Sequence, residues 1–135
     1  MDFTIQRQLS IAIENRPGRL AAIGRLMAGQ GINIKDICVV DNVEQGMIRL
    51  ITSDPSACKT LLSSEGHIAV EADVLVLILK DLPGQLETVC SALDNAGINI
   101  DYAYGSDDAR EEEMRLIIKV SNLKKAAEVI SALEG

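Results

Sequence analysis

The sequence predicts an α+β fold built from two copies of one small unit, each with an antiparallel sheet and helices on one face of that sheet. Two observations lead to this prediction: the chain repeats itself at a fixed interval, and strand and helix signals follow the same order in both copies. Hydrophobic residues make up 47% of the chain, which is enough for a packed core. Because only 2% of the residues are aromatic, that core must consist of aliphatic side chains.

The repeat interval is 66 residues, because Pro17 recurs as Pro83 within the matching segments Ile11–Leu20 and Leu77–Leu86. Two further blocks keep this interval, Gly-Ile-Asn-Ile at 31–34 and 97–100, and Arg-Leu-Ile at 49–51 and 115–117. One register through three separated blocks is not expected by chance, so the chain is predicted to contain two copies of one unit.

Each copy is predicted to begin with a strand and a helix. Leu9–Ile13 alternates with the period of a half-buried strand, and Val74–Leu79 is apolar throughout, as in a strand covered on both faces. A Pro-Gly turn then leads into a helix that ends at Gly31 or Gly97, because glycine adopts the left-handed conformation at no steric cost. A second strand follows each of these glycines.

The second half of each copy is predicted to be a strand and a helix. Residues 47–51 and 114–120 have the composition of third strands. Asp54 and Pro55 mark the start of one following helix, with a side-chain cap and a proline at the first helical position. Asn122 is expected to cap the matching helix.

A final strand is predicted at Ile68–Glu71, and it runs almost directly into the first strand of the second copy. Phe3–Gln6 resembles this segment and leads into the first strand of the first copy in the same way. We therefore expect the N-terminal strand to complete the second unit, because the sheet edge would otherwise be left open. The predicted units are residues 1–71 and 72–135, with residues 1–8 pairing with the second.

Composition excludes several classes of function. A net charge of −7 disfavours binding to nucleic acids and to anionic membranes, because like charges repel. No apolar run is long enough to span a bilayer, and the N-terminus does not read as a signal peptide. Three widely spaced cysteines argue against a disulfide framework and indicate a cytoplasmic protein.

The βαββαβ order, with a Pro-Gly turn before the first helix and Gly-Ile-Asn-Ile after it, resembles the ACT domain family in both halves of the chain. The resemblance implies two ferredoxin-like units packed together. It also implies a regulatory protein that senses a small molecule, usually an amino acid, and that has no catalytic activity of its own. ACT domains commonly regulate metabolic enzymes and associate in pairs, so the resemblance implies a homodimer and a metabolic enzyme as a further partner.

The residues give a physical reason for amino-acid binding. The N-terminus of a helix offers unpaired N–H groups and a partial positive charge to a carboxylate, worth about 0.3–2 kcal/mol. Asp81 is expected to accept a hydrogen bond from the ligand ammonium, and an alanine there is expected to weaken binding about tenfold. The predicted ligand-binding residues lie in the two turns and at the starts of the second strands: Asn15, Arg16, Pro17, Gly18, Arg19, Leu20, Asn33, Ile34, Asp81, Leu82, Pro83, Gly84, Gln85, Leu86, Asn99 and Ile100.

Two alternatives remain open at the level of sequence. A Pro-Gly turn and a Gly-Ile-Asn-Ile link also serve as plain structural elements. The turns differ, since the first carries Arg16 and Arg19 and the second carries Asp81, so we expect non-equivalent sites, one of which can be empty. The alternative function is a ligand-free regulatory subunit or interaction module of an enzyme of amino-acid metabolism.

Other residues of interest have structural interpretations. His67 is the only histidine, and this disfavours a histidine-rich metal site and a nucleophilic site that depends on histidine. Tyr102 and Tyr104 share one strand face, and we expect them to line a pocket or a dimer face, because the acidic charge opposes RNA binding. The charged run 107–113 is interpreted as a solvated loop. No metal, cofactor or catalytic residue is predicted.

Overall fold

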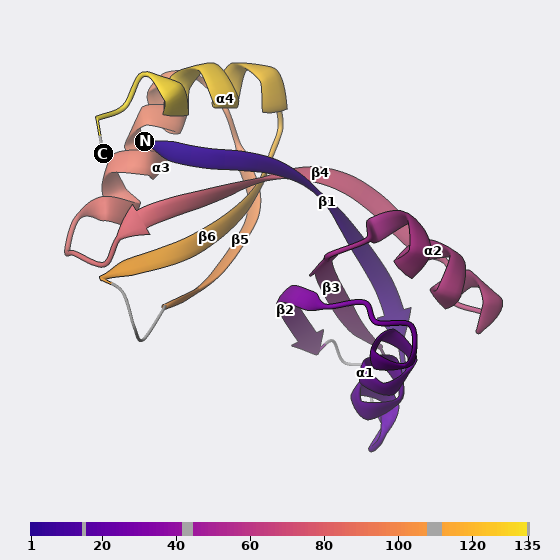
Figure 1. Ribbon diagram of the computed structural model, residues 1–135. Coiled ribbons are helices and arrows are strands. Elements are labelled where there is room, and N and C mark those ends of the chain that lie inside the picture. Colours follow the sequence, from indigo (N-terminus) through magenta and orange to yellow (C-terminus); the bar gives the residue numbers. More distant parts are fainter. Residues whose placement is uncertain (15, 42–44, 108–111, 135) are drawn as a thin grey trace. The chain divides into compact units, whose positions relative to one another are not determined.

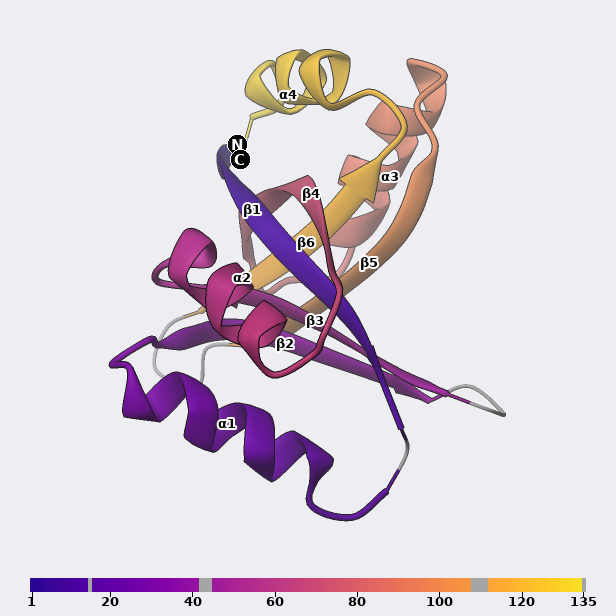
Figure 2. The same cartoon turned by 90° about the vertical axis from the view of Figure 1, so that its right-hand side faces the viewer.

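The computed structural model describes residues 1–134 except 15, 42–44 and 108–111. Its elements follow the predicted order (Figures 1 and 2). They are β1 (Asp2–Ile13), α1 (Arg19–Gly29), β2 (Ile34–Asp41), β3 (Gly46–Thr52), α2 (Pro55–Ser64), β4 (Ala69–Lys80), α3 (Gln85–Asn95), β5 (Ile100–Asp107), β6 (Glu113–Val120) and α4 (Leu123–Ser131). The chain divides into two compact units, here called the first unit (Arg7–Ala72) and the second unit (Met1–Gln6 with Asp73–Gly135).

The first unit has the strand order β2-β3-β1-β4. β3 is antiparallel to both of its neighbours, with Leu50 opposite Leu9 of β1 and Ile37 of β2. Leu9 and Leu50 share a hydrophobic core with Ile23 of α1 and Leu62 of α2. Both helices therefore cover the same face of the sheet.

The second unit repeats this arrangement, with the order β1-β4-β6-β5. Leu77 of β4 lies opposite Leu116 of β6, and both pack in a core with Val89 of α3 and Ile130 of α4. Phe3 packs against the same core. The N-terminal strand thus completes the second unit, as the sequence predicts, and two ferredoxin-like βαββαβ units result.

The helix boundaries follow the predicted signals. The Asp54 carboxylate accepts a hydrogen bond from the Ala57 N–H at 3.0 Å, and the Asn122 side chain accepts one from the Lys125 N–H at 3.1 Å. Gly31, which follows α1, has a φ of 67°, a left-handed conformation that side chains with a Cβ rarely adopt.

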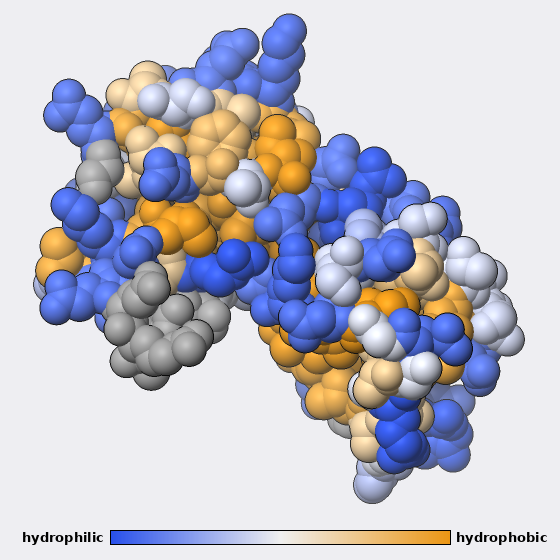
Figure 3. All heavy atoms as spheres, viewed as in Figure 1, coloured by the Kyte–Doolittle hydropathy of each residue, from blue (hydrophilic) through white to orange (hydrophobic). Residues whose placement is uncertain are grey.

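Polar and apolar residues both reach the described surface (Figure 3). Figure 3 shows one face of the molecule, on which hydrophilic residues predominate and apolar residues reach the surface in patches. No described helix is both long enough and apolar enough to cross a membrane. Within the described residues, no group of three or more His, Cys, Asp or Glu side chains is placed to hold a metal ion.

Candidate ligand-binding site

The turn between β4 and α3 forms one wall of the candidate site. Gly84 is the N-cap of α3 and has a φ of 90°, so the chain enters the helix through a left-handed residue. The Asp81 N–H donates to the Glu112 carbonyl at 2.8 Å, which fixes the turn against the start of β6. The Gln85 N–H donates to the Leu82 carbonyl at 3.4 Å, and the next N–H groups of α3 have no partners within the helix.

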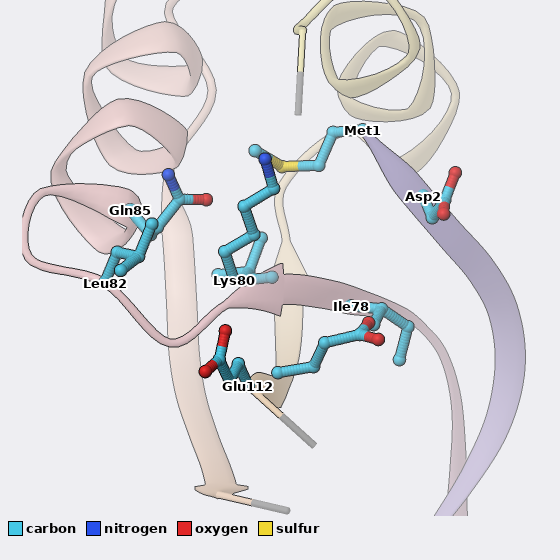
Figure 4. Close-up of a pocket in the computed structure, with 9 residues that line it drawn as sticks. Met1, Asp2, Ile78, Lys80, Leu82, Gln85 and Glu112 are labelled. Atoms are coloured by element: carbon cyan, nitrogen blue, oxygen red, sulfur yellow. The ribbon is translucent and has the colours of Figure 1, made fainter.

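A cavity of about 640 Å³ lies beside this turn, entirely within the second unit (Figure 4). Its volume falls within the range of about 300–1,000 Å³ that is usual for small-molecule sites. The lining residues come from the starts of β1, α3 and β6 and the end of β4: Met1, Asp2, Ile78, Leu79, Lys80, Leu82, Gln85, Glu112 and Glu113.

Lys80 and Gln85 supply complementary polar groups to the cavity. Figure 4 shows the Lys80 side chain extending toward Met1, with the Gln85 amide facing the same space. The Gln85 Oε1 atom is buried and accepts no hydrogen bond from any described residue. Such an unsatisfied acceptor costs about 1–3 kcal/mol, which a ligand donor would recover. Lys80 forms no ion pair with another described residue, so its ammonium is available to an anionic group.

Carboxylates complete the lining. Glu113 lies directly opposite Lys80 in the β4–β6 register, and Glu112 precedes it. Figure 4 shows Glu112 on the other side of β4 from the tip of Lys80. The cavity lining therefore contains both ammonium and carboxylate groups, as a site for a zwitterion requires.

The equivalent turn of the first unit is organised differently. A smaller cavity of about 340 Å³ is lined by Arg16, Pro17, Gly18 and Arg19. The Glu14 carboxylate pairs with the Arg16 guanidinium and lies 3.6 Å from that of Arg19. The cations of this turn thus share an internal partner, in contrast to Lys80. The two turns therefore differ in their ion pairs within the described residues.

The predicted turn residues are placed as follows. Leu82 and Gln85 line the larger cavity, whereas Asp81, Pro83, Gly84 and Leu86 flank it. Arg16, Pro17, Gly18 and Arg19 line the smaller cavity, and Leu20 is exposed. Asn15 lies outside the described residues.

The predicted strand residues lie at the other end of each first helix. The Asn33 N–H donates to the Ser53 hydroxyl at 2.9 Å, and the Asn99 N–H donates to the Ser121 hydroxyl at 3.0 Å. Ile34 and Ile100 open β2 and β5. The eleven residues of α1 or α3 separate these groups from the turn of the same unit by about 16 Å. The structure therefore does not bring the two sets together within one unit.

Sequence reasoning missed Lys80 and the carboxylates of β6. Lys80 lies one repeat interval of 66 residues after Glu14, so the reversal of charge between the two copies was visible in the sequence. Glu112 and Glu113 belong to the run interpreted as a solvated loop, and only the β4–β6 pairing brings them to the turn. Part of that run, residues 108–111, lies outside the described residues.

The fold and the repeated turn define a protein of paired ACT domains. A sequence model of the family described as "ACT domain pair" matches residues 3–134, and the chain belongs to this family. The predicted family is thereby confirmed.

Solved structures show the same architecture. Protein BT0572 from Bacteroides thetaiotaomicron is 29% identical with a TM-score of 0.88, and the alignment covers 96% of this chain and 88% of that one. The ligand-free regulatory subunit of aspartate kinase from Thermus thermophilus is 16% identical with a TM-score of 0.69, over 97% and 96% of the two chains. The corresponding subunit from Thermus flavus is 18% identical with a TM-score of 0.70, over 97% and 92%. At these low identities, the two Thermus subunits show only that the fold is similar. No curated protein matches the sequence.

Proposed function

We propose that this chain is a non-catalytic regulatory protein whose second unit binds a free amino acid in the cavity at Lys80 and Gln85. The observation that carries the proposal is the buried, unpartnered Gln85 Oε1 beside a lysine without an ion pair among the described residues, in a cavity of suitable size. The odd number of free cysteines fits a reducing cytoplasm.

The binding mode follows from the chemistry of the lining. The ligand carboxylate pairs with the Lys80 ammonium and the first N–H groups of α3, because both are positive. The ligand ammonium donates to Gln85 Oε1 and to a carboxylate of β6. Each hydrogen bond to a charged group contributes about 1.5–3 kcal/mol.

Regulation requires that the amino acid bind two states of the protein with different affinity. In the proposed mechanism the ligand joins the end of β4, the turn and the start of β6, and so favours the arrangement in which these segments are held together. A homodimer, or a complex with an enzyme of amino-acid metabolism, then responds to that shift. The similarity in fold to regulatory subunits of aspartate kinase supports a role of this kind.

A second candidate function is that of a ligand-free interaction module. Leu82 in the turn before α3 and Leu86 in the first turn of α3 are 58% and 52% exposed. Exposed apolar pairs of this kind are suited to contact a protein partner. Such a module would form a stable complex with a catalytic chain and would not respond to amino acids.

A thermal-denaturation screen of the purified protein against the common amino acids at millimolar concentration tests the proposal. A ligand at about 100 times its dissociation constant stabilises the fold by roughly 2.7 kcal/mol, which raises the melting temperature measurably. Calorimetric titration of Lys80→Met, with Lys124→Met as a control for loss of an exposed lysine on α4, then locates the site. A melting temperature that no amino acid raises would contradict the proposal and favour the interaction module.

A further inference from the structure

A second concavity lies in the first unit, between α1 and the connection from α2 to β4. It has a volume of about 460 Å³ and is here called the arginine groove. Its lining consists of Arg19, Ala22, Ile23, Arg25 and Leu26 from α1, with Glu65 and His67 from the connection between α2 and β4. None of these residues belongs to the cavity at Lys80.

The walls of the groove are fixed by the fold. Gly66 has a φ of 85°, and its N–H donates to the Ser63 carbonyl at 3.0 Å. The His67 N–H donates to the Leu62 carbonyl at 2.9 Å, which closes the end of α2 and holds the imidazole beside α1. Ile23 is buried in the core and forms an apolar floor. One wall of the groove is therefore α1, and the other is a connection that is hydrogen-bonded to the end of α2.

The charge of the groove is opposite to that of the protein. Arg19 and Arg25 outweigh Glu65 in the lining, whereas the chain as a whole carries −7. The Arg19 guanidinium lies 3.6 Å from the Glu14 carboxylate. Arg25 has no ion pair with another described residue, so its guanidinium is available to a ligand.

The internal repeat shows that the fold does not require these cations. The positions equivalent to Arg19 and Arg25 on α3 are Gln85 and Ser91, which are uncharged. The two helices have the same length and the same place in their units. The arginines are thus a property of the first unit alone and call for an explanation other than helix formation.

We propose that the arginine groove binds a small aliphatic dicarboxylate. A guanidinium presents its N–H donors in a planar fork that matches a carboxylate, and two forks match two carboxylates. Arg19 and Arg25 are six residues apart, about 9 Å along the helix axis, and their long side chains can converge on the ends of one molecule. Ala22, Ile23 and Leu26 line the same groove and provide apolar contact for the methylene chain. The proposal is independent of the amino acid bound at Lys80.

The test is a titration of the full chain with glutarate, followed by ¹H–¹⁵N NMR spectra in buffer of physiological ionic strength, where weak surface attraction is screened. We expect saturable shifts confined to the amides of α1 and of residues 65–67. Arg25→Gln is expected to weaken the interaction at least about tenfold, equivalent to about 1.4 kcal/mol. Lys124→Gln, which removes an exposed cation from α4, and Lys80→Met are both expected to leave glutarate binding unchanged.

Four results would overturn the proposal. They are the absence of saturable shifts, equal binding by Arg25→Gln and the unmodified protein, loss of binding in Lys80→Met, and equal shifts with neutral glutaramide or with inorganic phosphate. Loss in Lys80→Met would place the dicarboxylate in the other cavity. Equal shifts with phosphate would show that the groove recognises charge and not an organic dicarboxylate. Because Arg25 is exposed, its replacement is not expected to affect folding.

Discussion

Glu14 and Lys80 occupy the same position in the two repeats, at the end of the first strand, and carry opposite charges. Glu14 pairs with Arg16 and lies 3.6 Å from Arg19, so one carboxylate of the first turn is shared between two cations. Lys80 has no ion pair with a described residue and lines the larger cavity. This charge reversal, together with Leu82 and Gln85 at the positions of Arg16 and Arg19, thus distinguishes a turn with internal ion pairs from one without them among the described residues.

This relationship predicts a different response to charge reversal at the two positions. Lys80→Glu is expected to abolish amino-acid binding, because the ligand carboxylate would meet a like charge, with a loss of more than about tenfold. The matched variant Glu14→Lys alters the first turn only and is expected to leave affinity unchanged. Isothermal titration calorimetry measures both variants. Equal losses of affinity would show that the two turns act as one site.

The Gln85 side chain is predicted to lower the stability of the protein slightly and to strengthen amino-acid binding. Its buried Oε1 accepts no hydrogen bond from another described residue, so Gln85→Leu is expected to leave stability unchanged or to raise it by about 1 kcal/mol. The same change is expected to weaken amino-acid binding, because the acceptor for the ligand ammonium is lost. Chemical denaturation and calorimetry give the two quantities. Gln30→Leu, at an exposed glutamine of the first unit, is the control and is expected to alter neither.

The fold was predictable because its signals are local and occur twice. The repeat interval aligned the turns, and the caps at Asp54 and Asn122 fixed the starts of two helices. Phe3 could be assigned to the second unit from its likeness to the strand at Ile68–Glu71, because both segments lead into a first strand in the same way.

The site was predictable only in part. Leu82 and Gln85 follow from the turn motif, whereas the contribution of Glu112 depends on strand pairing between segments far apart in the sequence. Asp81 was the expected partner of the ammonium, yet it is exposed and is not among the lining residues. Which side of a turn faces a cavity is decided by the packing of neighbouring strands, and the motif alone does not carry that information.

Gly105 is predicted to be essential to the sheet of the second unit. A Cβ atom at this position would lie 2.5 Å from the Arg115 carbonyl oxygen on the neighbouring strand, too close for any real contact. Gly105→Ala is therefore expected to destabilise the protein by about 1–3 kcal/mol, since backbone must move. Gly24→Ala is the matched control, because a Cβ there meets nothing within 4 Å and α1 gains a better helix former. We expect it to stabilise by about 0.5–1 kcal/mol in urea denaturation. Equal effects of the two alanines would contradict the close approach.

Cys58 is predicted to be the least reactive of the three cysteines. Burial raises the pKa of the Cys58 thiol above its ordinary value of 9.0, and the nearby Asp54 charge adds to the increase, while the neighbouring Thr52 hydroxyl partly offsets it. The thiolate is the reactive form, so the native protein at about pH 8 is expected to react slowly at Cys58 with an aromatic disulfide reagent. Cys38 and Cys90 are partly exposed and are expected to react first, and all three are expected to react alike in denaturant.

The same pKa shift predicts how stability depends on pH. Because the folded state holds the Cys58 proton more tightly than the unfolded chain, its contribution is fully present below pH 9.0 and is lost as the pH rises through the folded-state pKa. Denaturation curves across this range, compared with those of Cys58→Ala, isolate the contribution of the thiol. The alanine variant is expected to be less stable at neutral pH, because it leaves a small cavity, and to show a shallower decline above pH 9.0. An identical decline in both proteins, or modification of native Cys58 as fast as that of Cys38, would show that the thiol is not desolvated by the packing of α2 on the sheet.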